Sequence, residues 1–226
     1  MHVALLASGP NSWVWWSWIG DHQHEVYAYT REHITLTALS VLYGFLIALP
    51  LSIFAARRRA VAAVVVPTVN ALYTIPSVAL LSLLLPVTGL GRTPAVIALT
   101  IYSLAILVRN FVEGLRGVSA DVLDAADGMG YTPLRRLVRV ELPLALPAIV
   151  AGIRLATVST IGLVTITFIV DQGGLGRFIQ DGYTRDFHTP LVLGIVLSVA
   201  LAVVADLLLV LVERAVTPWQ RAAGAR

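Results

Sequence analysis

Residues 119–143 have the sequence SADVLDAADGMGYTPLRRLVRVELP, and this stretch lies between two long apolar runs. Ser119 can cap the start of a helix, where Asp121 and Asp124 lie near the positive end of the helix dipole. Gly130 can end the same helix, because glycine readily adopts the left-handed conformation that follows many helices. The first half of the stretch therefore predicts a short helix that is closed by a glycine.

The second half of the stretch predicts another short helix. Thr132 and Pro133 suit its cap and its first residue, because the N–H that proline lacks is unpaired at that position in any case. We expect Leu142-Pro143 to end this helix at the membrane surface. Between them lie Arg135, Arg136 and Arg139 together with Leu134, Leu137 and Val138. Two short helices hinged at a glycine are compact enough to enter a groove on a partner and stiff enough to transmit its movement.

The rest of the chain has the composition of an integral membrane protein. Apolar residues make up 58% of the chain and charged residues 13%, whereas soluble domains carry about 25% charged residues. A bilayer core of about 30 Å takes about 20 helical residues to cross, and the apolar runs do not alternate like barrel strands. We therefore predict an all-α membrane protein with about five spans, at residues 34–56, 62–88, 93–112, 144–170 and 189–212. Prolines within the second span, Pro67, Pro76 and Pro86, predict a kink or break there.

Two residue types that many enzymes need are missing from the chain. It contains no cysteine, which excludes disulfides, thiolate nucleophiles and cysteine metal sites. It contains no lysine either, because all 16 basic residues are arginine. Without a P-loop lysine the chain is not a conventional ATPase, and Schiff-base chemistry is also excluded. No acid, base or metal cluster converges within the predicted spans, so we do not expect an enzyme.

The arginines predict the orientation of the chain, because cytoplasmic loops are enriched in basic residues. With five spans the two termini lie on opposite sides. If the N-terminus is outside, the outer segments hold Arg31, Arg92, Arg177 and Arg185. The inner segments, without Arg109 and Arg154 near span ends, then hold Arg57, Arg58, Arg59, Arg116, Arg135, Arg136, Arg139, Arg214, Arg221 and Arg226. We therefore expect an outer N-terminus, a cytoplasmic C-terminus and a cytoplasmic location for residues 119–143.

Residues 1–30 are predicted to form an external segment that lies on the membrane surface. They lack the basic start and the long apolar core of a signal peptide. Four tryptophans suit the interface between lipid and water, namely Trp13, Trp15, Trp16 and Trp18. A cation-binding aromatic box is the alternative interpretation of these side chains.

The spacing within residues 119–143 resembles a known motif. Asp124-Ala125-Ala126 is followed by three residues, Gly130, nine residues and Val140-Glu141-Leu142-Pro143. This closely resembles the "EAA" loop of ATP-binding-cassette (ABC) importer permeases, in which Glu-Ala-Ala, Gly and Ile-x-Leu-Pro have the same spacing. Asp124 stands in place of the Glu and Val140 in place of the Ile. The resemblance implies that Asp124, Ala125, Ala126, Gly130, Leu142 and Pro143 belong to a loop that couples the chain to an ATPase.

Other stretches within about residues 30–220 resemble one branch of these permeases, the glycine betaine/carnitine/choline/proline importers. They include Ala48-Leu49-Pro50-Leu51, Tyr73-Thr74-Ile75-Pro76-Ser77, Val108-Arg109-Asn110, Ala151-Gly152-Ile153-Arg154, Gly173-Gly174-Leu175-Gly176 and Ala205-Asp206-Leu207. A departure is Val170-Asp171-Gln172, where the family usually has small residues. The resemblance implies the transmembrane domain of a type I ABC importer over residues 31–216, followed by a cytoplasmic tail at 217–226.

The same resemblance implies a transport subunit of the bacterial inner membrane that works within an assembly. Two permease subunits, identical or different, form the pathway for a quaternary-ammonium osmolyte, and two ATPase subunits bind ATP and magnesium. No cofactor is therefore expected in this chain. Some relatives carry a solute-binding protein fused after the last span, and because this chain ends at Arg226 we expect a separate one.

Several polar residues within the spans are further candidates. Arg154 and Asp206 are isolated charges at similar depth near the cytoplasmic ends of spans four and five, and a structural ion pair is the favoured interpretation. Polar residues near the middle of span two are candidates for lining the pathway, namely Asn70, Tyr73, Thr74 and Ser77. Gly173–Gly176 is expected to form a tight external turn, with a gate hinge as the alternative.

Two other functions stay open at this stage. One is an ABC importer permease for another small solute, of the methionine or alkylsulfonate type. The other is an autonomous secondary transporter, which would need carboxylates at mid-membrane depth or an internal repeat. Among the acidic residues, Asp206 comes closest to meeting the first requirement, and we see no convincing internal repeat.

Overall fold

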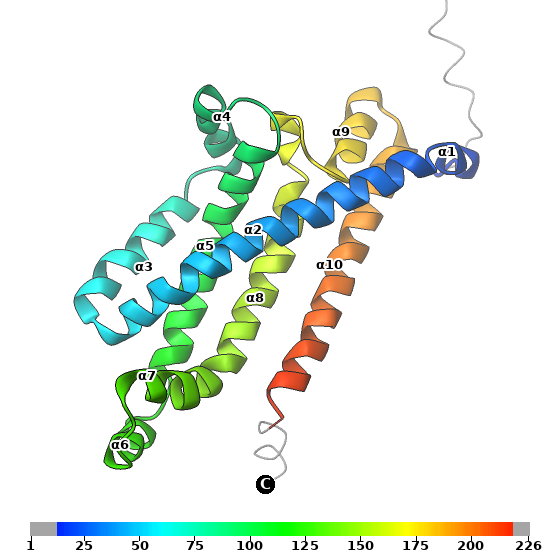
Figure 1. Cartoon of the computed structure of the whole chain (residues 1–226). Helices are drawn as coiled ribbons and strands as arrows, with labels where there is room; N and C mark the ends of the chain where they lie inside the picture. Colours follow the sequence, from blue (N-terminus) through cyan, green and yellow to red (C-terminus); the bar gives the residue numbers. More distant parts are fainter. Residues whose placement is uncertain (1–12, 219–226) are drawn as a thin grey trace, which may run out of the picture.

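Helices form the regular structure of residues 13–218, the part of the chain that the computed structural model describes (Figure 1). The long or span-forming helices are α2 (Gln23–Arg57), α3 (Arg59–Tyr73), α4 (Ser77–Thr88), α5 (Arg92–Arg116), α8 (Leu142–Val164) and α10 (His188–Val216). The short ones are α1 (Trp16–Asp21), α6 (Ala120–Gly128), α7 (Pro133–Arg136), a π-helical turn (Leu137–Glu141), a 3-10 helix (Thr167–Val170) and α9 (Gly176–Arg185). The start of the expected surface segment and most of the expected tail lie outside the described residues.

Four helical stretches are long and apolar enough to cross a membrane, and a broken pair supplies a fifth. The four are α2, α5, α10 and the continuous helical stretch Pro133–Val164. In the fifth, α3 and α4 meet at an angle of 95°. The predicted break in the second span is therefore present, and it falls at Pro76. The hydroxyl of Tyr102 on α5 donates a hydrogen bond of 2.5 Å to the carbonyl of Ile75, which helps to satisfy the backbone at the break.

Helix α5 lies between α2 and α8 and forms the centre of the packing. Small residues allow these helices to approach closely, as is typical of membrane helices. A Cβ atom added at Gly44 of α2 would lie 2.3 Å from the Ser103 hydroxyl, and one at Gly152 of α8 would lie 2.7 Å from Asn110 Cβ. The Ser103 hydroxyl also donates to the carbonyl of Ser40 at 3.2 Å. Small residues and hydroxyl groups therefore hold the centre of the bundle together.

Two helix boundaries differ clearly from the predicted spans. The first membrane helix begins at Gln23 rather than near residue 34, so residues 23–30 belong to it and not to a separate surface segment. The fourth ends at Val164, and a turn and the 3-10 helix follow it. These residues are apolar enough to read as membrane-spanning, but Asp171 and Gly173 adopt positive φ and end the helical path before the next element.

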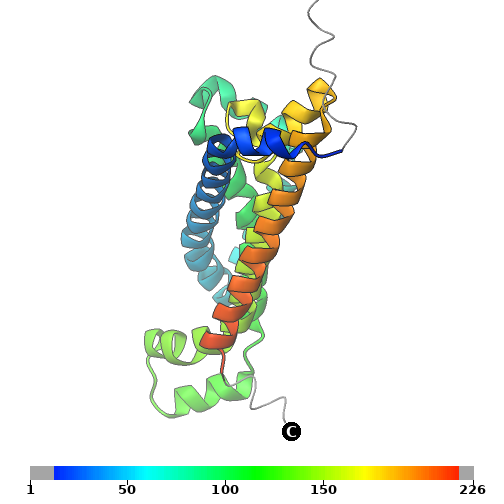
Figure 2. The same cartoon turned by 90° about the vertical axis from the view of Figure 1, so that its right-hand side faces the viewer.

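The two ends of the molecule carry different short elements. Figures 1 and 2 show α6 and α7 at one end, where α10 also ends, and α1, α4 and α9 at the opposite end. We call the first the hairpin end and the second the opposite end. The candidate site residues are divided between these two ends and the bundle between them.

Candidate functional site

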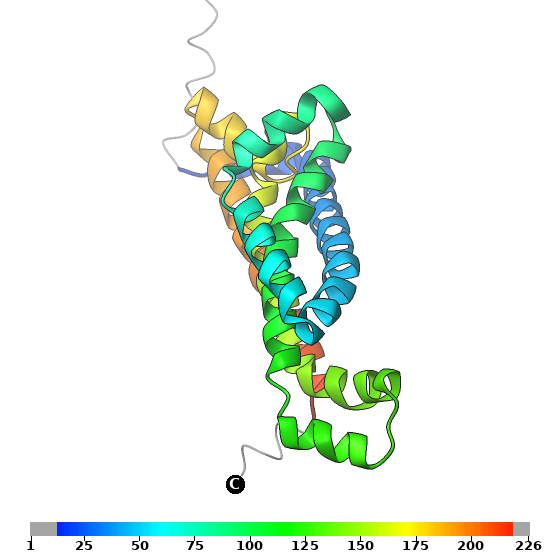
Figure 3. The ribbon, with the colours of Figure 1, turned by 90° about the vertical axis from the view of Figure 1, so that its left-hand side faces the viewer.

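The α6–α7 hairpin, comprising residues 119–143, projects from the bundle as two antiparallel arms (Figure 3). Its turn has the hydrogen bonds of a Schellman motif, because Tyr131 N–H donates to Ala126 O at 3.1 Å and Gly130 N–H donates to Asp127 O at 2.9 Å. Gly130 has a φ of 78°, a conformation that strongly favours glycine. The glycine hinge predicted from the sequence is therefore present in the structure.

The caps of the two arms differ in how fully they match the prediction. Thr132 caps α7 as predicted, since its hydroxyl accepts a hydrogen bond from Arg135 N–H at 3.4 Å. Ser119 occupies the cap position of α6, but its side chain makes no capping hydrogen bond. The start of α6 is therefore set by its backbone and not by the hydroxyl.

The prediction that Leu142-Pro143 ends the second arm is wrong. The arm continues from α7 through the π-helical turn into α8, as a single helical stretch from Pro133 to Val164. Leu142 N–H donates to the carbonyl of Leu137, five residues earlier. Proline has no N–H and crowds the carbonyl four residues before it in a regular helix. The wider π turn accommodates Pro143 without breaking the helix.

Glu141 connects the hairpin to the rest of the bundle. Only 8% of this residue is exposed, and its Oε1 atom lies 3.0 Å from Arg136 Nε and 3.6 Å from Arg57 Nη2, at the end of α2. Arg136 also pairs with Asp127 on α6, and Arg57 donates to the carbonyl of Pro133 at 3.3 Å. One buried carboxylate thus joins both arms of the hairpin to the first membrane helix.

The sequence analysis included Glu141 in the motif but gave it no role. The signal was available, because a carboxylate directly before Leu-Pro, at the start of a long apolar helix, needs a partner. Its partner Arg57 lies far away in the sequence, so the spacing of the motif does not reveal the contact.

The hairpin buries some of the motif residues and exposes others. Ala126 is 1% exposed and Leu137 is 8% exposed, and Leu137 packs in the same cluster as Phe111 and Ala145. Asp124 and Ala125 are exposed, and the Leu142-Pro143 pair is partly buried in the first turn of α8. The hairpin also exposes large apolar side chains, namely Val122, Met129, Leu134 and Val138. It therefore presents an unpartnered surface away from the bundle.

Arg154 and Asp206 lie together in the structure. Arg154 makes two hydrogen bonds to Asp206, with Nε 3.0 Å from Oδ1 and Nη2 3.2 Å from Oδ2. A second carboxylate also takes part, because Arg154 Nη1 donates to Glu213 Oε2 at 2.8 Å. The arginine on α8 thus bridges two acidic residues on α10, and the sequence analysis had not linked Glu213 to it.

The four polar candidates of span two surround the break between α3 and α4. Asn70, Tyr73 and Thr74 are exposed and Ser77 is partly exposed. The Thr74 hydroxyl donates to the carbonyl of Ala71 at 2.7 Å, as expected at a helix end. The ring of Tyr73 meets that of Tyr102 at 78°, with centroids 5.7 Å apart. The break therefore places most of this polar set on the surface of the single chain.

At the opposite end, the turn before α9 is fastened to α2 by Glu32 and His33. Gly174 N–H donates to Glu32 Oε1 at 2.9 Å, and Leu175 N–H donates to His33 Nδ1 at 3.3 Å. His33 is fully buried, and its Nε2 donates to the carbonyl of Ile161 on α8 at 3.0 Å. The imidazole thus ties three segments together. The sequence analysis did not single out His33, although two polar residues directly before an apolar run are a signal for such an anchor.

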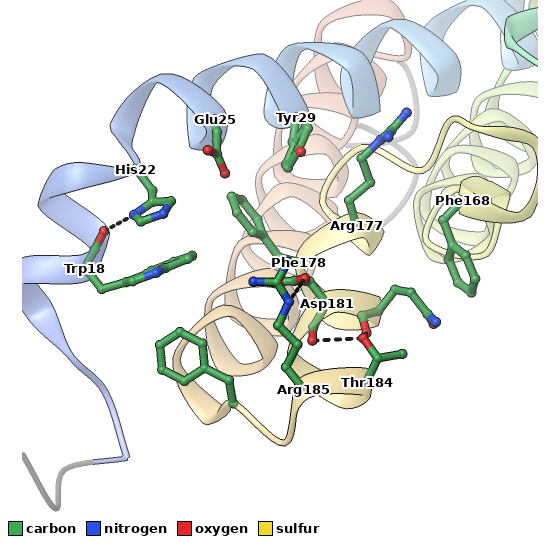
Figure 4. Close-up of a pocket in the computed structure, with 12 residues that line it drawn as sticks. Trp18, His22, Glu25, Tyr29, Phe168, Arg177, Phe178, Asp181, Thr184 and Arg185 are labelled. Atoms are coloured by element: carbon green, nitrogen blue, oxygen red, sulfur yellow. Dashed lines mark hydrogen bonds and ion pairs between the residues drawn. The ribbon is translucent and has the colours of Figure 1, made fainter. Parts of the chain in front are cut away.

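Of the four N-terminal tryptophans, Trp18 enters a recess between α1, α2 and α9. Figure 4 shows Trp18, Glu25 and Tyr29 facing Phe178 of α9 across this recess. Trp13 and Trp16 are 72% and 77% exposed, and Trp15 N–H donates to the Thr189 hydroxyl at 2.9 Å. The tryptophans therefore occupy different environments and do not form one uniform belt.

A known family of transport proteins matches most of the chain. The family described as "Binding-protein-dependent transport system inner membrane component" matches residues 48–218. The chain belongs to this permease family. It is therefore a transport subunit of the inner membrane, from a family whose systems depend on a binding protein.

Relatives of this permease have names that refer to osmolytes. It is 39% identical over 189 residues to the choline transport system permease protein OpuBB of Bacillus subtilis, covering 84% of this chain and 87% of the relative. It is 36% identical over 194 residues to the osmoprotectant import permease protein OsmW of Salmonella typhimurium, covering 84% and 90%.

A solved structure supports the fold of the permease. A chain of the MetNI methionine ABC transporter, in an inward-facing conformation, matches with a TM-score of 0.77 and 26% identity over 87% of this chain and 98% of that one. The predicted transmembrane domain of a type I ABC importer is thereby confirmed.

Proposed function

We propose that this permease forms the translocation pathway of an ATP-driven importer for quaternary-ammonium osmolytes, and that its α6–α7 hairpin docks on a separate ATPase. The observation that supports docking is the hairpin itself, a projecting element with exposed Met129, Leu134 and Val138 that is tied to the bundle through Glu141. A docked element of this kind transmits movement to α2 and α8 together, because Glu141 lies on the helical path into α8 and pairs with the end of α2.

The substrate class follows from the named relatives. Proteins named for choline, carnitine and glycine betaine transport are 36–39% identical to this chain over more than four-fifths of its length, whereas the methionine transporter chain is 26% identical. We therefore favour choline, glycine betaine, carnitine or proline over methionine or an alkylsulfonate.

The assembly that we propose contains more than this chain. Two permease subunits enclose the pathway, two ATPase subunits bind ATP and magnesium at the hairpin end, and a separate binding protein delivers the osmolyte at the opposite end. Asn70, Tyr73, Thr74 and Ser77 then face the second permease subunit at the pathway. The ion pair of Arg154 with Asp206 is assigned a structural role near the hairpin end.

The most direct test of this proposal is purification of the tagged chain from membranes, followed by reconstitution with the partners that co-purify. We expect an ATPase and a second permease subunit in the complex, and ATP-dependent uptake of labelled choline or glycine betaine once a binding protein is added. Uptake of methionine but of no quaternary-ammonium compound would instead support the alternative substrate class. A complex without any ATPase would contradict the proposal.

Coupling through the hairpin is tested at its turn. Gly130→Val places a β-branched side chain at a φ of 78°, which strains the turn. We expect uptake and transport-coupled ATP hydrolysis to fall while membrane insertion persists. The matched control is Gly128→Val, because Gly128, the last residue of α6, does not have a positive φ and has open space around an added Cβ atom. Equal uptake by the two variants would contradict the coupling role.

The orientation that we propose places the N-terminus outside and the hairpin in the cytoplasm. Because the chain has no cysteine, single cysteines can be introduced at Ser119 in the hairpin and at Asp181 in α9. In intact spheroplasts we expect a membrane-impermeant thiol reagent to label the cysteine at position 181 and not the one at 119. Equal labelling of both positions would overturn this orientation.

A further inference from the structure

The recess at the opposite end of the molecule has the size and shape of a small-molecule site. Its volume is about 470 Å³, within the range of about 300–1,000 Å³ that is typical of ligand pockets. Its walls come from three separate segments, with Trp18 on α1, Glu25 and Tyr29 on α2, and Phe178 and Asp181 on α9 (Figure 4). Phe187, just before α10, completes the aromatic lining.

The rings of Trp18, Phe178 and Phe187 form a corner, and the His22 ring stacks on Trp18 with centroids 3.9 Å apart. The plane of Trp18 lies at 75° to that of Phe178 and at 85° to that of Phe187, with centroids 6.1 and 5.6 Å apart. Tyr29 meets Phe178 at 66°, with centroids 4.9 Å apart. Rings at these angles and spacings can all lie within about 6 Å of one common point, which is the reach of a cation–π interaction.

Two carboxylates, Glu25 and Asp181, and two arginines line the recess, and both arginines already have carboxylate partners. Arg177 is balanced by Glu32, 3.8 Å away, and by Asp171, 3.4 Å away, and Arg185 is balanced by Asp181 at 2.7 Å. Glu25 makes no hydrogen bond or ion pair with any residue in the described range 13–218 and points toward the recess in Figure 4. Glu25 is therefore the lining carboxylate without an arginine partner among residues 13–218.

We infer that this recess binds the quaternary ammonium group of a small organic solute, an inference that rests on the proposed function because it assigns the osmolyte a site on the permease itself. A quaternary ammonium has no N–H to donate, so it is recognised by aromatic faces and a nearby carboxylate instead of by hydrogen bonds. Trp18 and Phe187 supply the rings, Phe178, which is only 3% exposed, supports Trp18 edge-on, and Glu25 supplies the uncompensated charge. The solute meets this site at the end of the molecule opposite the hairpin.

The test measures binding of radiolabelled choline to the permease–ATPase complex in lipid nanodiscs, without any binding protein. We expect saturable binding at millimolar concentrations or below, and no competition by the neutral isostere in which carbon replaces the ammonium nitrogen. Trp18→Leu and Glu25→Gln should each weaken binding by about tenfold, the loss expected for one cation–π or charge contact. Trp18→Phe keeps an aromatic face and should retain most of the affinity.

Matched controls separate the recess from general effects on the protein. Trp16→Leu changes a tryptophan on the same helix that is 77% exposed, and Glu113→Gln removes a carboxylate on α5 whose ion pair within residues 13–218 is with Arg109, four residues before it. Both should bind choline like the unaltered complex. Choline uptake without saturable binding to the complex would overturn the site and leave the proposed function standing, as would equal binding by Trp18→Leu and Trp16→Leu. A complex that binds choline at the recess but imports no osmolyte would contradict the proposed function alone.

Discussion

Gly130 in the hairpin and Gly174 in the turn before α9 both have positive φ, of 78° and 50°. Around Gly130 an added Cβ atom would meet nothing within 4 Å, whereas at Gly174 it would lie 2.7–2.9 Å from the Cβ, Cα and N atoms of His33. The hairpin therefore needs glycine for its backbone conformation alone. The opposite turn needs it for conformation and for space, because that turn is packed directly against α2.

The contacts that fasten the two ends also differ in kind. The hairpin is held by charges, with Glu141 between Arg57 and Arg136. The opposite turn is held by backbone hydrogen bonds, in which Gly174 N–H donates to Glu32 Oε1 and Leu175 N–H donates to the imidazole of His33. An ion-paired, projecting element can move as a unit, whereas a turn packed on backbone atoms has little freedom. This difference agrees with the proposal that movement enters the molecule at the hairpin end.

The largest effect is expected from alanine at Gly174. The substitution adds an overlap with the His33 backbone, which costs about 1–3 kcal/mol as overpacking, to about 1–2 kcal/mol for a left-handed alanine. Gly130→Ala incurs the second cost only. Thermal unfolding of the two variants in detergent, followed by fluorescence-detected size-exclusion chromatography, measures the difference. Equal losses of stability would remove the contrast between the two turns.

A smaller effect is expected from removing the charge of Glu141. Hydrogen bonds to charged groups contribute about 1.5–3 kcal/mol each, so Glu141→Gln should lower the stability of the hairpin by about that amount. Glu113→Gln is the control, because Glu113 and its partner Arg109 both have 67% of their side chains exposed and such pairs contribute about 0–1 kcal/mol. Hydrogen exchange of residues 119–143 should rise in Glu141→Gln and stay unchanged in Glu113→Gln. Unchanged exchange in both variants would show that Glu141 does not hold the hairpin.

The smallest effect is expected at Arg154 and Asp206, between the two ends. Arg154→Ala leaves the carboxylates of Asp206 and Glu213 without their arginine partner, whereas Asp206→Ala leaves Arg154 paired with Glu213. The first substitution should therefore lower the yield of folded protein more than the second. A double-mutant cycle should give a coupling energy of about 0.5–1.5 kcal/mol, within the range measured between membrane helices. Zero coupling would show that the two side chains reach the interface separately.

The parts of the fold that are determined by residues close together in the sequence could be predicted. Long uncharged runs predicted the membrane helices, and the three prolines of the second span predicted a break in it without fixing its place. Gly130 and Thr132 predicted the turn and the second cap of the hairpin. Each of these signals acts over a few residues. The coupling role of Asp124, Ala125 and Ala126 comes from a spacing pattern and stays a proposal.

The parts that were missed depend on residues far apart in the chain. The π-helical turn that carries the hairpin into α8 was read as a helix end, because proline after a leucine usually signals one. The contact of Glu141 with Arg57 and the anchoring of Gly174 by His33 join separate helices. The recess combines Trp18 with Phe178, and the sequence offered only a run of tryptophans as a clue. Tertiary contacts of this kind leave no local spacing to detect.

Helix α10 shows how this chain can be built in the membrane. Its most apolar window has a mean hydropathy of 3.0, against 1.8–2.1 for the other long helices, yet none of that window is buried within the chain. Its buried residues, Thr189, Pro190, Gly194 and Ser198, all lie in its first half, the half nearer α9. Such a helix partitions from the translocon into lipid on its own hydropathy and does not wait for the others to fold. We therefore expect a chain that is truncated before α10 to keep α2, α5 and α8 packed together. In the full chain, α10 inserts into the membrane independently and packs against the other helices last.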